Sequence, residues 1–195
     1  MGPRLTPPRT VIAITGVVAG GLILFGVRPT GVRWRRQRPS KVRGVVKELT
    51  GTASSTTDAS PEACMSLLED IDRYPTWHPE VVKEAKVLER DAEGRPTRAR
   101  TKLHVVHGPL TRDFNLVMSV SIDPSGTIKL RRIPHQPTDK ERFDVTWRVE
   151  PGNSSRIRLD LVADLNVPRF VPLSGVGDSI AQGMVSAATR ALGSA

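Results

Sequence analysis

Four histidines are the side chains best suited to acid–base chemistry or metal binding at neutral pH. His104 and His107 are three residues apart in a segment of alternating polarity. That spacing places them on opposite faces of a strand, which argues against joint metal chelation. His78 belongs to an aromatic turn and His135 lies between two prolines, and neither has a carboxylate at a useful spacing. We therefore expect no metal site, no cofactor and no catalytic histidine.

Nucleophile chemistry is equally poorly supported. Cys64 is the only cysteine, so an intrachain disulfide is excluded. It falls on the predicted apolar face of a helix, where we expect a small buried hydrophobe and not a reactive thiol. The sequence contains no serine or cysteine nucleophile motif and no phosphate-binding glycine loop. An enzyme is therefore the less favoured interpretation.

Seven segments of alternating polarity predict antiparallel strands with short turns between them. In one of them Ala99, Thr101, Leu103 and Val105 share a face opposite basic side chains, as a sheet with one buried and one solvated face requires. The expected strands cover residues 47–57, 81–90, 98–107, 112–122, 127–133, 142–150 and 156–165.

Two helices are expected to pack on this sheet. Ser60 is a suitable N-cap and Pro61 a suitable first residue for a helix that carries apolar side chains through Ile71. The prolines at 75 and 79 are expected to end that helix. A second helix, over residues 178–192, carries an apolar face that we expect to cover the sheet, and Gly193 is a suitable stop.

Two short motifs resemble a known family. The sequence reads ASPE at 59–62 and DRYPTWHP at 72–79, and residues 81–89 and 164–168 are also similar to the same family. These segments resemble the START-like polyketide cyclase/dehydrase and lipid transport family, also called SRPBCC proteins. The resemblance covers about residues 46–195. It implies an α+β helix-grip fold, in which a curved seven-stranded antiparallel sheet surrounds a long C-terminal helix and leaves a cavity between them.

The resemblance also favours a cavity that takes a hydrophobic guest, because ligand sites are mostly apolar with few polar groups. Thr101 is the clearest inward polar side chain, and Arg132 is a second candidate. The residues expected to contact the ligand are Trp77, Thr101, Leu103, Phe114, Leu116, Met118, Trp147, Leu161, Phe170, Leu173, Ile180, Met184 and Ala188. The alternative is that these side chains fill the interior, as in ordinary cores.

The connector at 166–177 is longer and more apolar than a simple loop needs to be. It holds Phe170 and Leu173 and directly precedes the C-terminal helix. We expect it to cover one end of the cavity as a gate, with these two side chains as its apolar contacts. The alternative is that the loop only plugs the core.

Residues 1–45 form a separate N-terminal arm. The 17 residues from Val11 to Val27 carry no charge, and an Arg-rich segment follows at 28–43. This pattern predicts an uncleaved single-pass anchor in the cell membrane with the domain at 46–195 in the cytoplasm. The Arg-rich segment would lie against anionic headgroups. A cleaved signal peptide and a start codon assigned too far upstream are the alternatives.

The net charge of +9 comes entirely from this arm. Nine of the 29 basic residues precede residue 46 and none of the 20 acidic residues does, so the rest of the chain carries 20 of each. A nucleic-acid-binding domain should carry its own basic surface. We therefore expect no nucleic-acid partner.

Three function classes remain open. The favoured one is a membrane-tethered carrier or sensor of a lipid or an isoprenoid quinone-like molecule, the quinone being suggested by the coenzyme Q-binding branch of the family. A polyketide cyclase or dehydratase would need several convergent polar groups in the cavity. A protein-interaction module would need a filled core and a cohesive exposed patch, for which the basic stripe Arg98, Arg100 and Lys102 is the one candidate.

Overall fold

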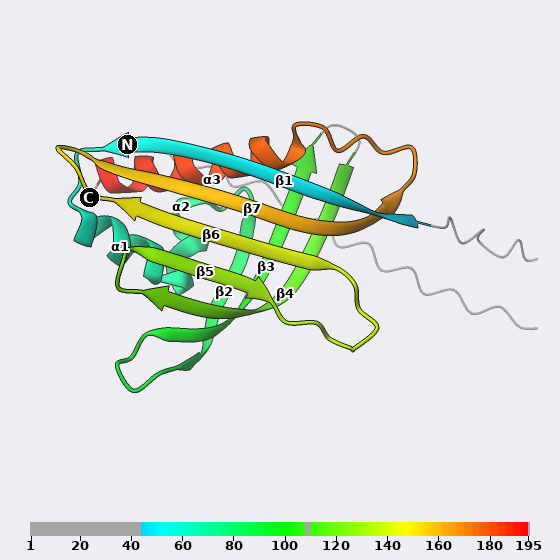
Figure 1. Cartoon of the computed structure of the whole chain (residues 1–195), viewed down its shortest axis with the longest axis horizontal. Helices are drawn as coiled ribbons and strands as arrows, with labels where there is room; N and C mark the ends of the chain where they lie inside the picture. Colours follow the sequence, from blue (N-terminus) through cyan, green and yellow to red (C-terminus); the bar gives the residue numbers. More distant parts are fainter. Residues whose placement is uncertain (1–43, 108–109, 195) are drawn as a thin grey trace, which may run out of the picture. The chain divides into compact units, whose positions relative to one another are not determined.

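The computed structural model describes residues 44–107 and 110–194 (Figure 1). The predicted anchor at 11–27, the Arg-rich segment and the predicted turn at 108–109 lie outside the described residues. The elements are β1 (Gly44–Thr57), α1 (Pro61–Glu69), a 3-10 turn η1 (Ile71–Arg73), α2 (Tyr74–Trp77), β2 (Val82–Arg90), β3 (Pro96–His107), β4 (Leu110–Asp123), β5 (Thr127–Arg132), β6 (Arg142–Glu150), β7 (Ser155–Pro168) and α3 (Val176–Gly193).

All seven strands form one antiparallel sheet in the order β1-β7-β6-β5-β4-β3-β2. β2 to β7 are a meander of sequential neighbours, and β1 pairs with β7 along its whole length. The sheet bends strongly, so that β3 and β4 cross the direction of β6 and β7 in Figure 1. The predicted alternation is confirmed most clearly in β7, where every second residue from Ser155 to Val167 is buried.

The concave face of the sheet is covered by helices. α3 packs along β1 and β7 at one edge of the sheet, whereas η1 and α2 pack on β2 at the opposite edge. The core lies between these layers and includes Trp147, Leu159 and Val185, each exposing 1% of its surface or less. The expected curved sheet around a long C-terminal helix is therefore confirmed.

The first helix follows the sequence prediction at its start and departs from it at its end. Ser60 Oγ accepts a hydrogen bond from the Ala63 amide (3.2 Å), as expected of an N-cap. However, α1 ends at Glu69, and Pro75 lies in the first turn of α2 instead of ending a helix. Proline lacks only an N–H that the first turn does not use, so it suits the start of a helix.

No helix in the described residues is long and apolar enough to span a bilayer. The membrane-anchor prediction concerns residues before Gly44 and stays a prediction.

Candidate ligand-binding cavity

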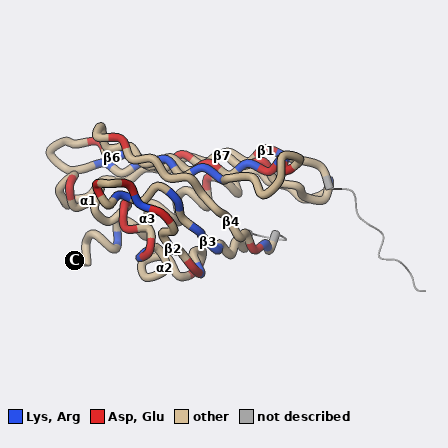
Figure 2. The backbone as a smooth tube through the Cα atoms, turned by 90° about the horizontal axis from the view of Figure 1, so that it is seen from below, with Lys and Arg blue, Asp and Glu red and all other residues tan. Residues whose placement is uncertain are grey.

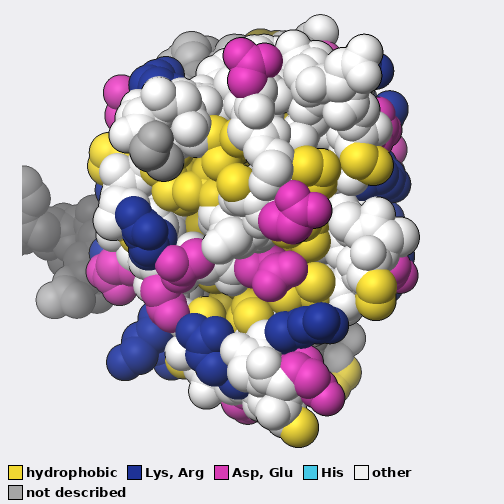
Figure 3. Space-filling model, turned by 90° about the vertical axis from the view of Figure 1, so that its left-hand side faces the viewer, with side chains coloured by type: hydrophobic (Ala, Val, Ile, Leu, Met, Phe, Trp, Pro, Cys, Tyr) yellow, Lys and Arg dark blue, Asp and Glu magenta, His cyan; other side chains and the backbone are white. Residues whose placement is uncertain are grey.

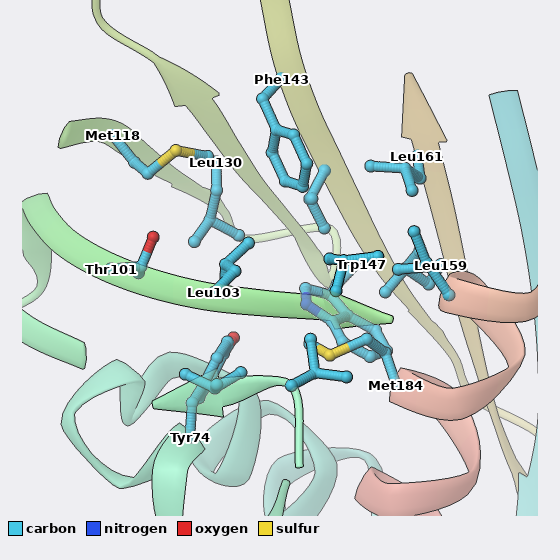
Figure 4. Close-up of a pocket in the computed structure, with 15 residues that line it drawn as sticks. Tyr74, Thr101, Leu103, Met118, Leu130, Phe143, Trp147, Leu159, Leu161 and Met184 are labelled. Carbon is cyan, nitrogen blue, oxygen red and sulfur yellow. The ribbon is translucent and has the colours of Figure 1, made fainter. Parts of the chain in front are cut away.

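An apolar cavity lies between the concave face of the sheet, α2 and α3 (Figure 4). It measures about 60 Å³, more than the roughly 10 to 15 Å³ that a single water molecule requires. Pockets that enclose a drug-sized ligand usually measure about 300 to 1,000 Å³. In this conformation the cavity therefore admits a small group, and a larger guest requires lining side chains to move.

The structure brings seven of the predicted ligand-contact residues together around this cavity. They come from β3, β4, β6, β7 and α3, and their side chains converge because the bent sheet faces α3. These residues are Thr101, Leu103, Met118, Trp147, Leu161, Ile180 and Met184. That they contact a ligand stays a prediction.

Three other predicted residues lie in the core but outside the cavity, and a fourth packs against the core. Phe114 packs on Phe143, with ring centroids 5.9 Å apart, and so stands behind the cavity wall. Leu116 and Ala188 are buried without lining it. Trp77 is half-buried outside the cavity, where it packs on Tyr74 (4.8 Å between centroids) and stacks on His78 (6.2 Å).

The gate prediction needs correction. Phe170 is 81% exposed and contributes nothing to the cavity wall. Leu173 is half-buried and packs against the core, again outside the cavity. The physical reason is that β7 continues to Pro168, which shortens the loop, and the Lys47 ammonium binds the carbonyl oxygens of Arg169 and Val171 (both 2.8 Å).

Sequence reasoning missed eight lining residues. Val105, Phe143, Val145 and Leu159 lie on the apolar faces that alternation predicts for their strands, so the alternation was the signal that could have found these four. The eight are Tyr74, Val81, Val82, Val105, Leu130, Phe143, Val145 and Leu159.

Three polar groups interrupt the apolar wall: the hydroxyls of Tyr74 and Thr101 and the indole N–H of Trp147 (Figure 4). The Tyr74 hydroxyl donates to the carbonyl oxygen of Leu68 (2.6 Å), and burial raises the pKa of this phenol. Arg132, the second polar candidate, does not line the cavity. Its guanidinium binds Asp139 (2.6 Å) at the end of β5.

The mouth of the cavity lies between β3 and α3. Five lining residues are half-buried, whereas the other ten are buried. Val145 is one of them, on β6, and the other four are Val81, Leu103, Ile180 and Met184, from which we place the mouth between β3 and α3. Leu103 is near the end of β3 and Ile180 near the start of α3. The half-buried part of the wall therefore lies toward the end of the domain where β7 leads into α3.

Comparisons with known proteins agree with this geometry. Residues 57–192 match the profile of the family described as polyketide cyclase / dehydrase and lipid transport. The chain belongs to this START-like family.

Two solved structures share the family's fold. A START superfamily protein from Mycobacterium smegmatis is 17% identical, with a TM-score of 0.59 over 74% of this chain and 97% of that one. TTHA0849 from Thermus thermophilus is 18% identical, with the same TM-score and coverage. No curated protein matches the sequence closely enough to count as a relative. The family binds hydrophobic small molecules or lipids, and this chain has that hydrophobic ligand-binding fold.

The family fold brings one histidine to a carboxylate that sequence reasoning did not assign to it. His104 Nδ1 lies 2.6 Å from Asp113 Oδ1, because the β3–β4 register places the two residues opposite each other. The pair is partly exposed and does not line the cavity. Among the described residues, no three His, Cys, Asp or Glu side chains group as metal ligands would.

Cys64 and the basic stripe have structural explanations within this fold. Cys64 is fully buried, and burial raises the pKa of its thiol. Arg98 pairs with Glu89 (3.0 Å) and Lys102 with Glu84 (3.6 Å) across β2 and β3. Basic and acidic positions are interspersed along the strands (Figure 2). The stripe is therefore not a cohesive positive patch.

A second hollow opens on the face shown in Figure 3, between α1 and the β4–β5 turn. Its floor includes Met65 and Ile122, and its rim carries Glu62, Glu69 and Asp123. It is open to solvent and more polar than the cavity between the sheet and α3.

Proposed function

We propose that this protein binds a hydrophobic small molecule, a lipid or an isoprenoid quinone-like compound, in the cavity between the sheet and α3, as a carrier or sensor at the membrane. The observation that carries the proposal is an almost wholly apolar cavity with a half-buried mouth in a member of this family. Burying about 200 Å² of apolar ligand surface would contribute about 5 kcal/mol before ordering costs.

The composition of the wall favours binding over catalysis. Of the residues that the structure describes, no Asp, Glu, His, Lys or Arg lines the cavity. Tyr74 is titratable, but burial raises the pKa of its phenol, which weakens it as an acid near neutral pH. A cyclase or dehydratase needs a proton donor or acceptor beside the reacting carbon. The polar groups in the wall are suited to orienting a guest.

The mouth offers a way to enlarge the cavity. Met184 is unbranched and half-buried, so its side chain can turn aside at a small cost. Ile180 lies one helical turn earlier on the same face of α3. We therefore expect a guest larger than the resting cavity to displace these two side chains first.

Apolar side chains beside the mouth support the membrane part of the proposal. Phe170 is 81% exposed and Val106 is 62% exposed. Arg112 Nη1 donates to the Asn166 carbonyl (3.0 Å), which joins the β3–β4 hairpin to the end of β7. Gly44 pairs with Pro168, so the chain also enters β1 at this end. Two exposed apolar tips beside the mouth suit contact with a bilayer surface.

Ligand binding is tested by filling the mouth. We expect the full-length chain, purified from its host without added lipid, to carry an apolar molecule detectable by native mass spectrometry. M184W should purify empty because the indole occupies the mouth. M65W, the same exchange on α1, should remain loaded. A wild-type chain that is empty and whose melting temperature is unmoved by phospholipid or ubiquinone would contradict the proposal.

Membrane contact needs a separate test. In the full-length chain reconstituted in vesicles containing brominated phospholipid, F170W should add tryptophan emission that the bromine quenches. L88W places the same probe at an exposed apolar position near the opposite end of β3 and should add unquenched emission. Equal quenching of the two variants would remove the membrane part and leave ligand binding intact.

A further inference from the structure

The indole N–H of Trp147 is a hydrogen-bond donor without a partner among the described residues. Trp147 is 1% exposed and lines the cavity from β6, and its Nε1 has no acceptor there. In Figure 4 this nitrogen is turned toward the side of the cavity where Tyr74, Leu103 and Thr101 lie. A buried indole N–H normally has a hydrogen-bond partner.

The nearest intramolecular candidate is the Tyr74 hydroxyl, whose oxygen retains acceptor capacity while its proton goes to Leu68. The indole N–H lies close enough to this oxygen to oppose the rise in the Tyr74 pKa that burial causes, yet the pair falls short of hydrogen-bond geometry, so the indole still lacks a full partner. Within the described part of the chain, Trp77 Nε1 and His78 Nε2 are also unpaired, but neither residue lines the cavity. The Trp147 N–H is thus the unpaired donor that a guest in the cavity would meet.

The charge of the guest is restricted as well. No charged side chain of the described residues lines the cavity, so a carboxylate or phosphate held there would lose its hydration without a counterion. The Thr101 hydroxyl, from β3, is the other polar group of the wall that can serve a second oxygen. The wall therefore suits a neutral molecule.

We propose that the cavity selects a neutral apolar molecule bearing a carbonyl oxygen, as in a ketone, ester or quinone, and that this oxygen accepts the hydrogen bond from Trp147 Nε1. This inference rests on the proposed hydrophobic-binding function. Apolar burial supplies the affinity, and Trp147 selects the functional group and fixes its orientation. A free fatty acid and a plain hydrocarbon both fit the wall less well.

The probes are a medium-chain methyl ketone, the alkane of equal length and the fatty acid of equal length, added to the 15N-labelled full-length chain. We expect the ketone to bind about fivefold to tenfold more tightly than the alkane, as one hydrogen bond allows. Only the ketone should move the indole proton of Trp147 downfield. That resonance is assigned by its loss in W147F.

The variants separate the hydrogen bond from packing. W147F should reduce the ketone preference to about onefold, whereas W77F, which alters an indole outside the cavity, should retain it. Y74F should leave the indole resonance of the empty protein unmoved, and a large shift would show that Tyr74 is the true partner and overturn the inference. Equal ketone and alkane affinity, or preference for the fatty acid, would overturn it while the proposed function stands. If none of the three probes binds, the inference fails, and the proposed function is decided separately by the co-purification and melting-temperature test with phospholipid and ubiquinone.

Discussion

Gly51 of β1 and Gly177 of α3 cross so closely that neither has room for a side chain. A Cβ on Gly51 would lie 2.1 Å from the carbonyl carbon of Gly177, and a Cβ on Gly177 would lie 2.0 Å from the carbonyl oxygen of Thr50. Asp178 Oδ1 accepts a hydrogen bond from the Thr52 amide (3.0 Å) at the same crossing. The start of α3, and with it Ile180 at the cavity mouth, is therefore held by backbone contact with β1.

Adding a methyl group at this crossing should strongly destabilise the domain. We expect G51A and G177A each to lower the free energy of unfolding by about 3 kcal/mol or more, because the clash is with backbone that cannot turn aside. Chemical denaturation of each variant measures this.

G183A is the matched control for the crossing. Gly183 lies inside α3, and its Cβ would be 3.8 Å from His78 Nε2, an ordinary contact distance. Alanine favours a helix interior over glycine by up to about 1 kcal/mol. G183A should therefore be neutral or stabilising. A loss as large as that of G177A would show that glycine flexibility, and not the close crossing, explains the result.

Removing the Tyr74 hydroxyl should leave a backbone carbonyl at the end of α1 without a hydrogen-bond donor. This hydroxyl donates to the Leu68 carbonyl in the last turn of α1, where no later helical amide is available. We expect Y74F to cost about 1 to 3 kcal/mol, because the carbonyl stays buried without a donor. T76V removes an exposed hydroxyl that donates to the Arg73 carbonyl (2.7 Å), where water can substitute, and should cost much less. Equal losses would contradict this role.

His78 should make stability depend on pH. It is 7% exposed beneath α3, and burial is the main cause that lowers its pKa below the ordinary value of 6.5. Nearby Glu80 opposes this shift and Arg190 reinforces it. The unfolded chain therefore binds the proton more readily than the folded one. The stability that the neutral His78 imidazole contributes is fully present above about pH 6.5 and declines as the pH falls below that value.

The measurement is the free energy of unfolding at several pH values between about 5 and 8. H78Q should flatten the decline on the acid side, and H135Q, at an exposed loop position, should leave it as in the wild type. A decline that is unchanged in H78Q would assign the pH dependence to other groups.

The ion pair between Glu141 and Arg112 should contribute more to stability than an exposed ion pair does. Glu141 Oε1 accepts from Arg112 Nη2 (2.7 Å), and Arg112 in turn binds the Asn166 carbonyl (3.0 Å) and covers the Phe114 ring at 4.8 Å. We expect E141Q to cost about 1 kcal/mol, since both ends of the ion pair are about three-quarters buried. E89Q, which breaks the exposed Arg98 pair, should cost almost nothing in the same unfolding assay. Equal costs would contradict the distinction.

Much of the architecture could be predicted from local patterns. The alternation that buries one face of each strand appears in residues two apart, and it predicted the strands of the sheet to within a few residues of their observed bounds. Ser60 and Pro61 placed the start of α1, and the apolar stripe containing Ile180 and Met184 placed α3. These features depend on neighbours along the chain, so a linear reading captures them.

The site was less predictable, because a buried face says nothing about which of its residues border empty space. Phe114 of β4 and Phe143 of β6 both belong to the buried layer, yet only Phe143 reaches the cavity. Trp77 and Trp147 were both expected to contact the ligand, but the first packs outside the cavity and the second presents its N–H inside.

By itself the sequence determined the strand faces, the approximate starts of α1 and α3, the absence of an intrachain disulfide and the confinement of excess positive charge to residues before 46. Tertiary structure decided the contour of the cavity, the exposure of Phe170, the crossing of Gly51 with Gly177 and the pairing of His104 with Asp113. Those features arise from strand register and from the bend of the sheet. Both depend on contacts between residues distant along the chain, which the period of a single strand does not encode.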